Sequence, residues 1–204
     1  MYKFTYYTEQ DDQKVIDFMK ENAFALITGT GEKYPIATQI PLEIKVKEGK
    51  IFLEGHLMRK TDHHLAFEKN SNVLVLFTGP HCFVSASWYT NPSVGSTWNY
   101  ITVHAKGTIS FTDEEGTLKA VKAVSDKYEG TTSAGAFDNL PNEYIAHMVI
   151  AIVGFSIEVE SIDNVFKLSQ NRDEASQKNI IEQLRKRSDD NAAKIAEEME
   201  RRLS

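Results

Sequence analysis

The chain has 204 residues, 41% of them hydrophobic, which is enough for one domain with a sizeable core and some appendages. Its single cysteine, Cys82, excludes an intramolecular disulfide and any metal site built from several cysteines. The formal net charge of −6 argues against tight non-specific binding of nucleic acid, which depends on lysine and arginine neutralising phosphates.

The first half of the chain predicts a helix followed by short strands. Apolar residues recur at helical spacing over 9–22, with acidic residues near the start. Thr61 or Asp62 can cap a short helix that runs through Phe67. The turn Gly79-Pro80 is expected to end the strand before it. Apolar or alternating segments bounded by turns predict strands over 24–28, 36–46, 51–55 and 73–77.

The second half contains the clearest strand pattern of the chain. Apolar and polar residues alternate over 101–111 and again over 153–159, which indicates half-buried strands. Helical spacing predicts helices over 118–128 and 144–150, joined by a loop of small and polar residues over 130–140. Many short strands joined by hairpins favour an antiparallel barrel of Greek-key type over a parallel sheet. We therefore predict a mainly β fold with peripheral helices.

The last part of the chain, from Arg172 onward, predicts two charged helices. Basic residues gather at 185–187 and 201–202, but acidic residues lie among them, as on a solvated amphipathic helix. This pattern argues against direct DNA binding by these helices. We divide the chain into a barrel domain, 1–170, and a helical extension, 171–204. No segment has the pattern of a membrane span or a signal peptide, so we expect a soluble protein of the cytoplasm.

A first candidate site follows the predicted strand at 51–55. The string Gly55-His56-Leu57-Met58-Arg59-Lys60 places two cations directly before a helix start, where backbone N–H groups and the helix dipole also favour an anion. This combination suits a phosphate, although on composition alone a surface turn with solvated cations is the better explanation. His63 and His64 point in different directions on a helix, so we expect no shared metal ion.

Other segments combine aromatic rings with polar groups. The strings 79–89 and 97–100 hold tryptophan and tyrosine beside serine and asparagine, as a site for a planar ring requires, although taken alone they fit the edge of a core better. The run 167–172 offers polar donors after the last strand, either as the rim of a ligand site or as a helix cap. Cys82 is interpreted as a packing residue.

Taken in order, these strings resemble the PaiB-like family, which is named for FMN-binding negative transcriptional regulators. The matching strings are GHLMR at 55–59, GPHCFVSASWY at 79–89, TWNYITVH at 97–104 and KLSQNR at 167–172. One such string is weak evidence, but four in the same order are specific. The family pattern has proline where this chain has Ala86. The family is similar to the flavin-binding split barrels that include the pyridoxamine phosphate oxidases.

The resemblance implies an FMN-binding split β-barrel that works as a homodimer, with FMN in a groove at the subunit interface. It implies that Arg59 and Lys60 hold the phosphate of FMN. The other residues that it implies for the flavin site are Gln39, Ile40, Pro41, Leu42, His56, Ser85, Ser87, Trp88, Trp98, Asn99, Lys167, Gln170 and Arg172.

The residues leave three functions open. No dedicated acid, base or nucleophile is evident, so neither a catalytic residue nor a small-molecule substrate is identified, and a flavin-dependent oxidoreductase is one hypothesis. A flavin-bearing transcriptional regulator is the second, weakened as a direct DNA binder by the acidic charge and the missing helix-turn-helix pattern. A haem-binding or haem-degrading split barrel is the third, with His104 or His147 as the axial ligand.

Overall fold

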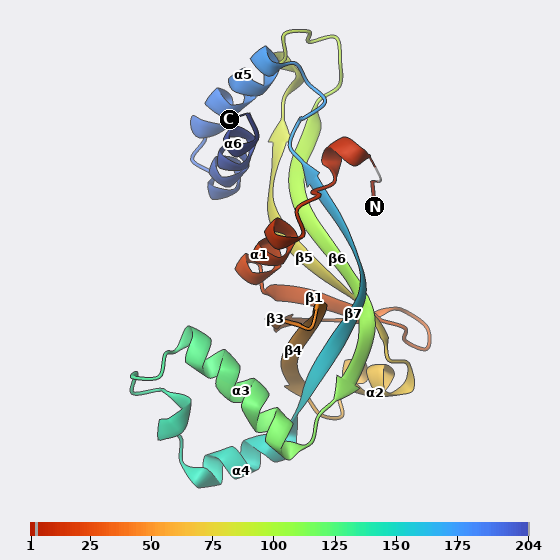
Figure 1. Cartoon of the computed structure of the whole chain (residues 1–204), viewed down its shortest axis with the longest axis vertical. Coiled ribbons are helices and arrows are strands. Elements are labelled where there is room, and N and C mark those ends of the chain that lie inside the picture. The colour runs from red at the N-terminus through yellow and green to blue at the C-terminus, as the bar shows by residue number, and fades with distance from the viewer. Residues whose placement is uncertain (3, 204) are drawn as a thin grey trace. The chain divides into compact units, whose positions relative to one another are not determined.

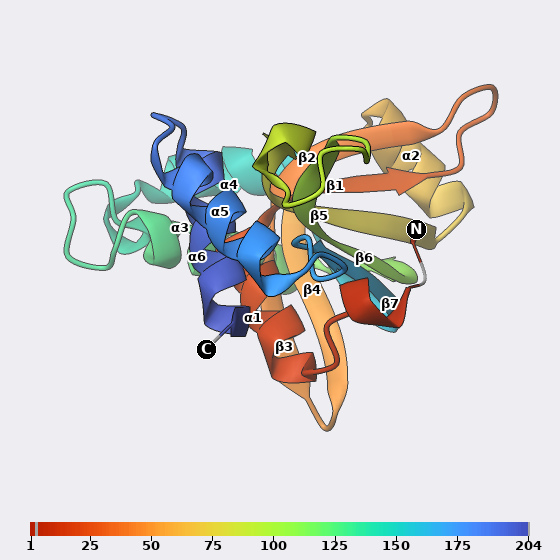
Figure 2. The same cartoon turned by 90° about the horizontal axis from the view of Figure 1, so that it is seen from above.

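The computed structural model describes residues 1–2 and 4–203. Figures 1 and 2 together label the strands and the α-helices of the chain. The strands are β1 (Phe24–Gly29), β2 (Ile36–Pro41), β3 (Glu43–Lys47), β4 (Lys50–Met58), β5 (Asn72–Val84), β6 (Thr97–Phe111) and β7 (Ile152–Lys167). The helices are α1 (Asp12–Glu21), α2 (Asp62–Lys69), α3 (Glu114–Tyr128), α4 (Asn142–Ala151), α5 (Glu174–Arg185) and α6 (Asp190–Leu203). Short 3-10 helices are η1 (Thr5–Tyr7), η2 (Ala86–Trp88) and η3 (Phe137–Asn139).

The strands form one seven-stranded sheet in the order β2-β1-β5-β6-β7-β4-β3. The pairs β1–β2, β1–β5, β3–β4 and β4–β7 are antiparallel, which confirms the predicted type of sheet. The chain divides into two compact units: unit 1 comprises 1–18, 78–103 and 163–204, and unit 2 comprises 19–77 and 104–162. The three long strands β5, β6 and β7 each continue from one unit into the other.

Unit 2 has its core on the sheet, where alternate residues of the strands are buried. The fully buried side chains, each less than 2% exposed, include Ile27, Leu53, Phe77, Phe155 and Ile157 of the strands and Phe67 of α2. The predicted continuous strand over 36–46 is wrong, because β2 and β3 are separate strands. They break at Leu42, whose N–H donates to the carbonyl oxygen of Ala23 at 2.9 Å instead of to a sheet neighbour.

The predicted turn at Gly79-Pro80 is also wrong, because β5 runs through both residues to Val84. The pairing of β5 with β1 covers Val73 to Leu76, so Pro80 lies beyond it. Proline is tolerated on a strand edge where no neighbour needs its missing N–H. An added Cβ at Gly79 would lie 2.4 Å from the Phe18 ring, so glycine here allows the ring to approach the strand.

The predicted helices of both units are confirmed. In unit 2, Asp113 caps α3 by accepting from Gly116 N at 2.8 Å. In unit 1, α5 and α6 lie side by side, as Figures 1 and 2 show, and they bury Ile180, Leu184 and Ile195. Among the described residues, no helix is both long and apolar enough to cross a membrane.

Candidate functional site

Unit 2 contains a pocket of about 350 Å³ between β2, β4 and the start of α2. Four residues of the predicted flavin site line it, and Leu42 does not, because its side chain is buried in the core. The lining also includes threonine and histidine side chains that the sequence did not single out for this site. The full set is Thr38, Gln39, Ile40, Pro41, His56, Leu57, Met58, Thr61, His63 and Ile152.

Gly55 allows β2 and β4 to approach each other beside this pocket. It faces Phe155 across the β4–β7 pair. A Cβ at position 55 would lie 2.9 Å from Cζ of Phe155 and 3.3 Å from the carbonyl oxygen of Pro41, which is closer than ordinary packing permits. The glycine of the string GHL is therefore explained by packing against Pro41, the last residue of β2.

His56 brings an unsatisfied polar atom to the pocket. Its side chain is half-buried, and Nδ1 has no hydrogen-bond partner within the described part of the chain. Burial lowers the pKa of His56 below its ordinary value of 6.5, because it disfavours the charged form of the imidazole. An unpaired buried nitrogen costs free energy unless a ligand or water completes it.

Arg59 and Lys60 follow β4 directly and precede α2. Neither side chain makes a hydrogen bond or an ion pair with any residue that the structure describes. The backbone N–H of Arg59 donates to the carbonyl oxygen of Ala151 at 2.9 Å, which holds the turn in place. Thr61 caps α2, so two unpaired cations lie beside the positive end of a helix, an arrangement that favours an anion.

Two side chains at the start of α2 modify the positive electrostatic potential near Arg59 and Lys60. Asp62 carries a mostly exposed carboxylate, whose Oδ1 accepts from the backbone N–H of His63 at 2.8 Å. Oγ1 of Thr61 lies 3.0 Å from Nε2 of His63 and donates to the carbonyl oxygen of Met58 at 2.9 Å. Asp62 therefore takes one N–H of the helix end, and the side-chain charges of Arg59 and Lys60 remain the main attraction for an anion.

Unit 1 contains an exposed aromatic face on β5 and β6. Trp98 is 53% exposed and Phe83 is 41% exposed, and their ring centroids lie 6.1 Å apart in an edge-to-face arrangement. The ring centroid of His81 lies 6.2 Å from that of Trp98. A face of this kind can stack on a flat ring.

The connection between β5 and β6 is fixed by hydrogen bonds within unit 1. Oγ atoms of Ser85 and Ser87 lie 2.8 Å apart, and Asn179 of α5 donates from Nδ2 to the carbonyl oxygen of Trp88 at 2.8 Å. The N–H of Ala86 donates to Oγ of Ser96 at 3.0 Å. A proline at position 86, as in the family pattern, has no N–H for this bond. This chain therefore lacks the rigid proline ring at position 86 and has a hydrogen bond there instead.

Asn99 lies next to Trp98 but is fully buried, because successive strand residues face opposite sides. Its Oδ1 accepts from Oγ of Ser169 at 3.0 Å, and its Nδ2 donates to Sδ of Met199 in α6 at 3.5 Å. Ser169 is 2% exposed and has a left-handed φ of 61°. Asn99 thus joins β6 to the turn after β7.

The remaining predicted residues of unit 1 are largely engaged within the unit. Nζ of Lys167 donates to Oγ1 of Thr97, and burial together with the nearby charge of Arg172 lowers the pKa of Lys167. The Gln170 side chain bonds to the backbone of its own turn. The guanidinium of Arg172 lies 4.4 Å from the ring centroid of Tyr89.

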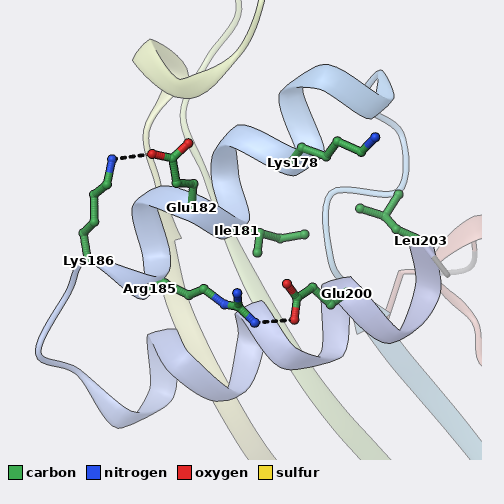
Figure 3. A pocket seen from close by; sticks show the side chains of 7 residues that line it. All are labelled: Lys178, Ile181, Glu182, Arg185, Lys186, Glu200 and Leu203. Carbon is green, nitrogen blue, oxygen red and sulfur yellow. Dashed lines mark hydrogen bonds and ion pairs between the residues drawn. The ribbon is translucent and has the colours of Figure 1, made fainter.

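A larger pocket of about 620 Å³ lies between α5 and α6 in unit 1 (Figure 3). Its cations are paired: Arg185 lies 2.5 Å from Glu200, Lys186 lies 2.6 Å from Glu182, and Lys178 pairs with the glutamate four residues before it. Because each charge has a local counterion, this pocket is less suited to an anion than the pocket beside Arg59. Among residues 1–2 and 4–203, no group of three or more His, Cys, Asp or Glu side chains could hold a metal ion.

The antiparallel sheet and its pocket place the chain among the split β-barrel proteins, as predicted. The model of a family described as "Putative FMN-binding domain" matches residues 1–161. The chain is 35% identical to the protease synthase and sporulation protein PAI 2 of Bacillus subtilis (strain 168) over 204 residues, which are 100% of this chain and 98% of that protein. The chain therefore belongs to the PaiB-like family of FMN-binding-domain proteins.

Solved structures support the fold. The flavocytochrome Anf3 from Azotobacter vinelandii has a TM-score of 0.61 and 12% sequence identity, covering 81% of this chain and 72% of that one. The FAD and haem binding protein from Mycobacterium smegmatis has a TM-score of 0.60 and 14% identity, covering 79% and 73%. At these identities the likeness concerns the fold alone.

Proposed function

We propose that this protein binds FMN, with its phosphate on Arg59 and Lys60 and its ring beside the β2 residues of the pocket in unit 2. The observation that supports this most directly is the two side-chain cations without partners beside a pocket lined by Gln39, Pro41 and His56. These residues fit the group, because a phosphate takes charge and N–H donors and a ring takes apolar walls with a few polar atoms. A bound FMN would supply redox chemistry, and the protein would position it.

The remaining predicted residues are part of the same proposal. Ser85, Ser87, Trp88, Trp98 and Asn99 are proposed to contribute to the flavin site of a homodimer, with Lys167, Gln170 and Arg172 at its rim. Support comes from the exposed aromatic face of Trp98 and Phe83. Sedimentation of the flavin-loaded protein tests the dimer, and a monomer that retains FMN contradicts it.

The first experiment is the absorbance spectrum of the purified protein with and without added FMN, followed by titration of tryptophan fluorescence. The chain has two tryptophans, and both are proposed site residues, so bound flavin is expected to quench most of the emission. Single Trp88→Phe and Trp98→Phe variants assign the quenching. A protein that binds no FMN, or binds it without quenching, contradicts the proposed site.

The second experiment removes the phosphate contacts. Arg59→Gln with Lys60→Gln is expected to weaken FMN binding about 10- to 100-fold, as the loss of two charge-assisted contacts implies. Arg185→Gln with Lys186→Gln is the matched control, because it removes the same Arg-Lys pair from a surface where both cations are ion-paired. Equal losses of FMN affinity in the two double variants would show that the overall charge of the protein attracts FMN, and not specific contacts with Arg59 and Lys60.

We propose that the flavoprotein acts in the cytoplasm, either as a PaiB-type regulator, in line with its family, or as an oxidoreductase, in line with its FMN-binding domain. Bleaching of the flavin by a reduced nicotinamide, with turnover of an added acceptor, supports the oxidoreductase. A mobility shift that persists at physiological salt supports a regulator that contacts DNA. Binding seen only at low salt indicates non-specific attraction.

Haem is the second candidate ligand. Two structures of similar fold carry haem-related names, and Nδ1 of His56 in the pocket has no partner among the described residues. The histidines that the sequence suggested differ in position: His104 is half-buried on β6, and His147 is exposed on α4. A Soret band after haem addition, lost in one of the three single alanine variants, supports haem. FMN binding without such a band rejects it.

A further inference from the structure

The turn between β4 and α2 contains a residue in an unfavourable backbone conformation. Lys60 has a φ of 61°, in the left-handed region. For a residue other than glycine this conformation is unfavourable, because Cβ comes too close to the following carbonyl oxygen. It persists only where the surroundings fix it, and such positions gather at ligand sites. The question is which contacts hold Lys60 there.

One contact comes from His64, a residue of the first turn of α2. The backbone N–H of Lys60 donates to Nδ1 of His64, with an N–N distance of 3.3 Å. The imidazole is only 6% exposed, so it cannot reach a ligand itself. The same residue also closes the helix cap, since its own backbone N–H points at Oγ1 of Thr61 at 3.4 Å.

The His64 ring is held from two further sides. Its centroid lies 4.8 Å from the ring of Phe111 in an edge-to-face arrangement. Its Nε2 lies 3.7 Å from Oε1 of Glu68, one turn further along α2. This geometry fits the neutral tautomer with its proton on Nε2, because Nδ1 must accept from Lys60 while Nε2–H faces a carboxylate.

We propose that His64 is a positioning residue for the phosphate of FMN. Its buried ring accepts from Lys60 N–H and so fixes the left-handed turn that presents the Arg59 and Lys60 side chains. The inference rests on the proposed function, because the phosphate is the group that those cations would bind. As a positioning residue, His64 supports binding of the phosphate and not of the ring. A merely structural role would affect both.

The test compares FMN with riboflavin, which has the same ring and no phosphate. His64→Phe keeps a buried ring but removes the acceptor, and it is expected to weaken FMN binding about tenfold, as loss of one well-placed contact implies. Riboflavin binding is expected to change less than about twofold. His64→Asn supplies an oxygen near the position of Nδ1 and is expected to restore FMN affinity.

Phe67→Leu is the matched control, because Phe67 is a buried ring of the same helix and the acceptor of the Lys60 N–H is His64 instead. It is expected to lower stability without lowering the ratio of riboflavin to FMN dissociation constants. The inference is overturned if His64→Phe leaves that ratio unchanged or if Phe67→Leu lowers it equally. Wild-type protein that binds neither flavin overturns the proposed function as well.

A second measurement needs neither a variant nor a flavin. If Lys60 N–H is bonded to His64, its amide hydrogen exchanges slowly in the ligand-free protein, and the nitrogen chemical shift of His64 Nδ1 is that of an unprotonated acceptor. Fast exchange at Lys60, or a protonated Nδ1 at neutral pH, overturns the inference even if His64→Phe fails to fold.

Discussion

Replacing Ser169 with alanine tests the buried link between β6 and the turn after β7. The hydroxyl of Ser169 donates to Oδ1 of Asn99 at 3.0 Å, and the two residues are 2% and 0% exposed. Removing it leaves the amide oxygen of Asn99 buried without this donor, which costs about 1–3 kcal/mol of unfolding free energy. The left-handed φ of 61° is equally unfavourable for serine and alanine, so it cancels from this comparison.

Ser169→Gly separates the hydrogen bond from the backbone conformation. Glycine loses the same bond but gains roughly 1–2 kcal/mol in the left-handed region, offset by about 0.5–1 kcal/mol of extra entropy in the unfolded chain. We therefore expect glycine to be less destabilising than alanine by about 0.5–1 kcal/mol. Urea unfolding followed by circular dichroism measures the change in unfolding free energy of each variant, and the dependence of that free energy on urea concentration should be the same as in wild type.

The control for this series is Ser188→Ala, since Ser188 is an exposed serine of unit 1. Its unfolding free energy is expected to stay within about 0.5 kcal/mol of wild type. If the unfolding free energy of Ser169→Ala also stays within about 0.5 kcal/mol of wild type, the buried link is refuted. A glycine variant less stable than the alanine variant would refute the argument from the φ angle.

Three further predictions concern single residues. Lys60→Gly should unfold at higher urea than Lys60→Ala, by about 0.5 kcal/mol in free energy, because glycine accepts a φ of 61°; the reverse order would contradict the strained turn. Burial lowers the pKa of His56, so below its ordinary value of 6.5 the unfolded chain binds a proton that the folded chain excludes. The free energy of unfolding should therefore decrease as the pH is lowered below 6.5, and it should decrease less steeply in His56→Phe. Equal dependence on pH in the two proteins would contradict the lowered pKa of His56. Burial raises the pKa of Cys82 to about 11, so a thiol reagent should label it only as the protein unfolds, and rapid labelling of native protein would contradict this.

Local signals in the sequence predicted most of the elements. The alternation over 101–111 became β6, and Thr61, which the sequence offered as a cap, stands directly before α2. The predictions failed where neighbours decide the outcome. Pro80 reads as a turn by itself, yet β5 continues through it, beyond the residues that pair with β1. Such a result depends on sheet pairing, which a single segment does not encode.

In the candidate site, too, local signals predicted some features, and others depend on how the strands pair. The strings that carry the resemblance group residues by position, but neighbours in one string have different environments. Trp98 is 53% exposed and Asn99 is fully buried, as strand alternation requires. The pocket joins Gln39 of β2 to His56 of β4, and only the fold brings these strands together. Thr38 lines the same pocket without any motif to mark it.

The pairing of charges gives the strongest physical reason to look for an anion at Arg59 and Lys60. The chain carries 29 acidic residues against 23 basic ones, so carboxylates are abundant. Surface cations such as Arg185 and Lys186 accordingly find carboxylates within 2.6 Å. Arg59 and Lys60 find none among the described residues, although the carboxylate of Asp62 follows them in sequence. Two adjacent cations repel each other, and a left-handed residue adds to the cost of the turn. An external phosphate would relieve the repulsion, which is why loss of these cations should weaken FMN binding while leaving the unfolding free energy of the ligand-free protein unchanged or raised.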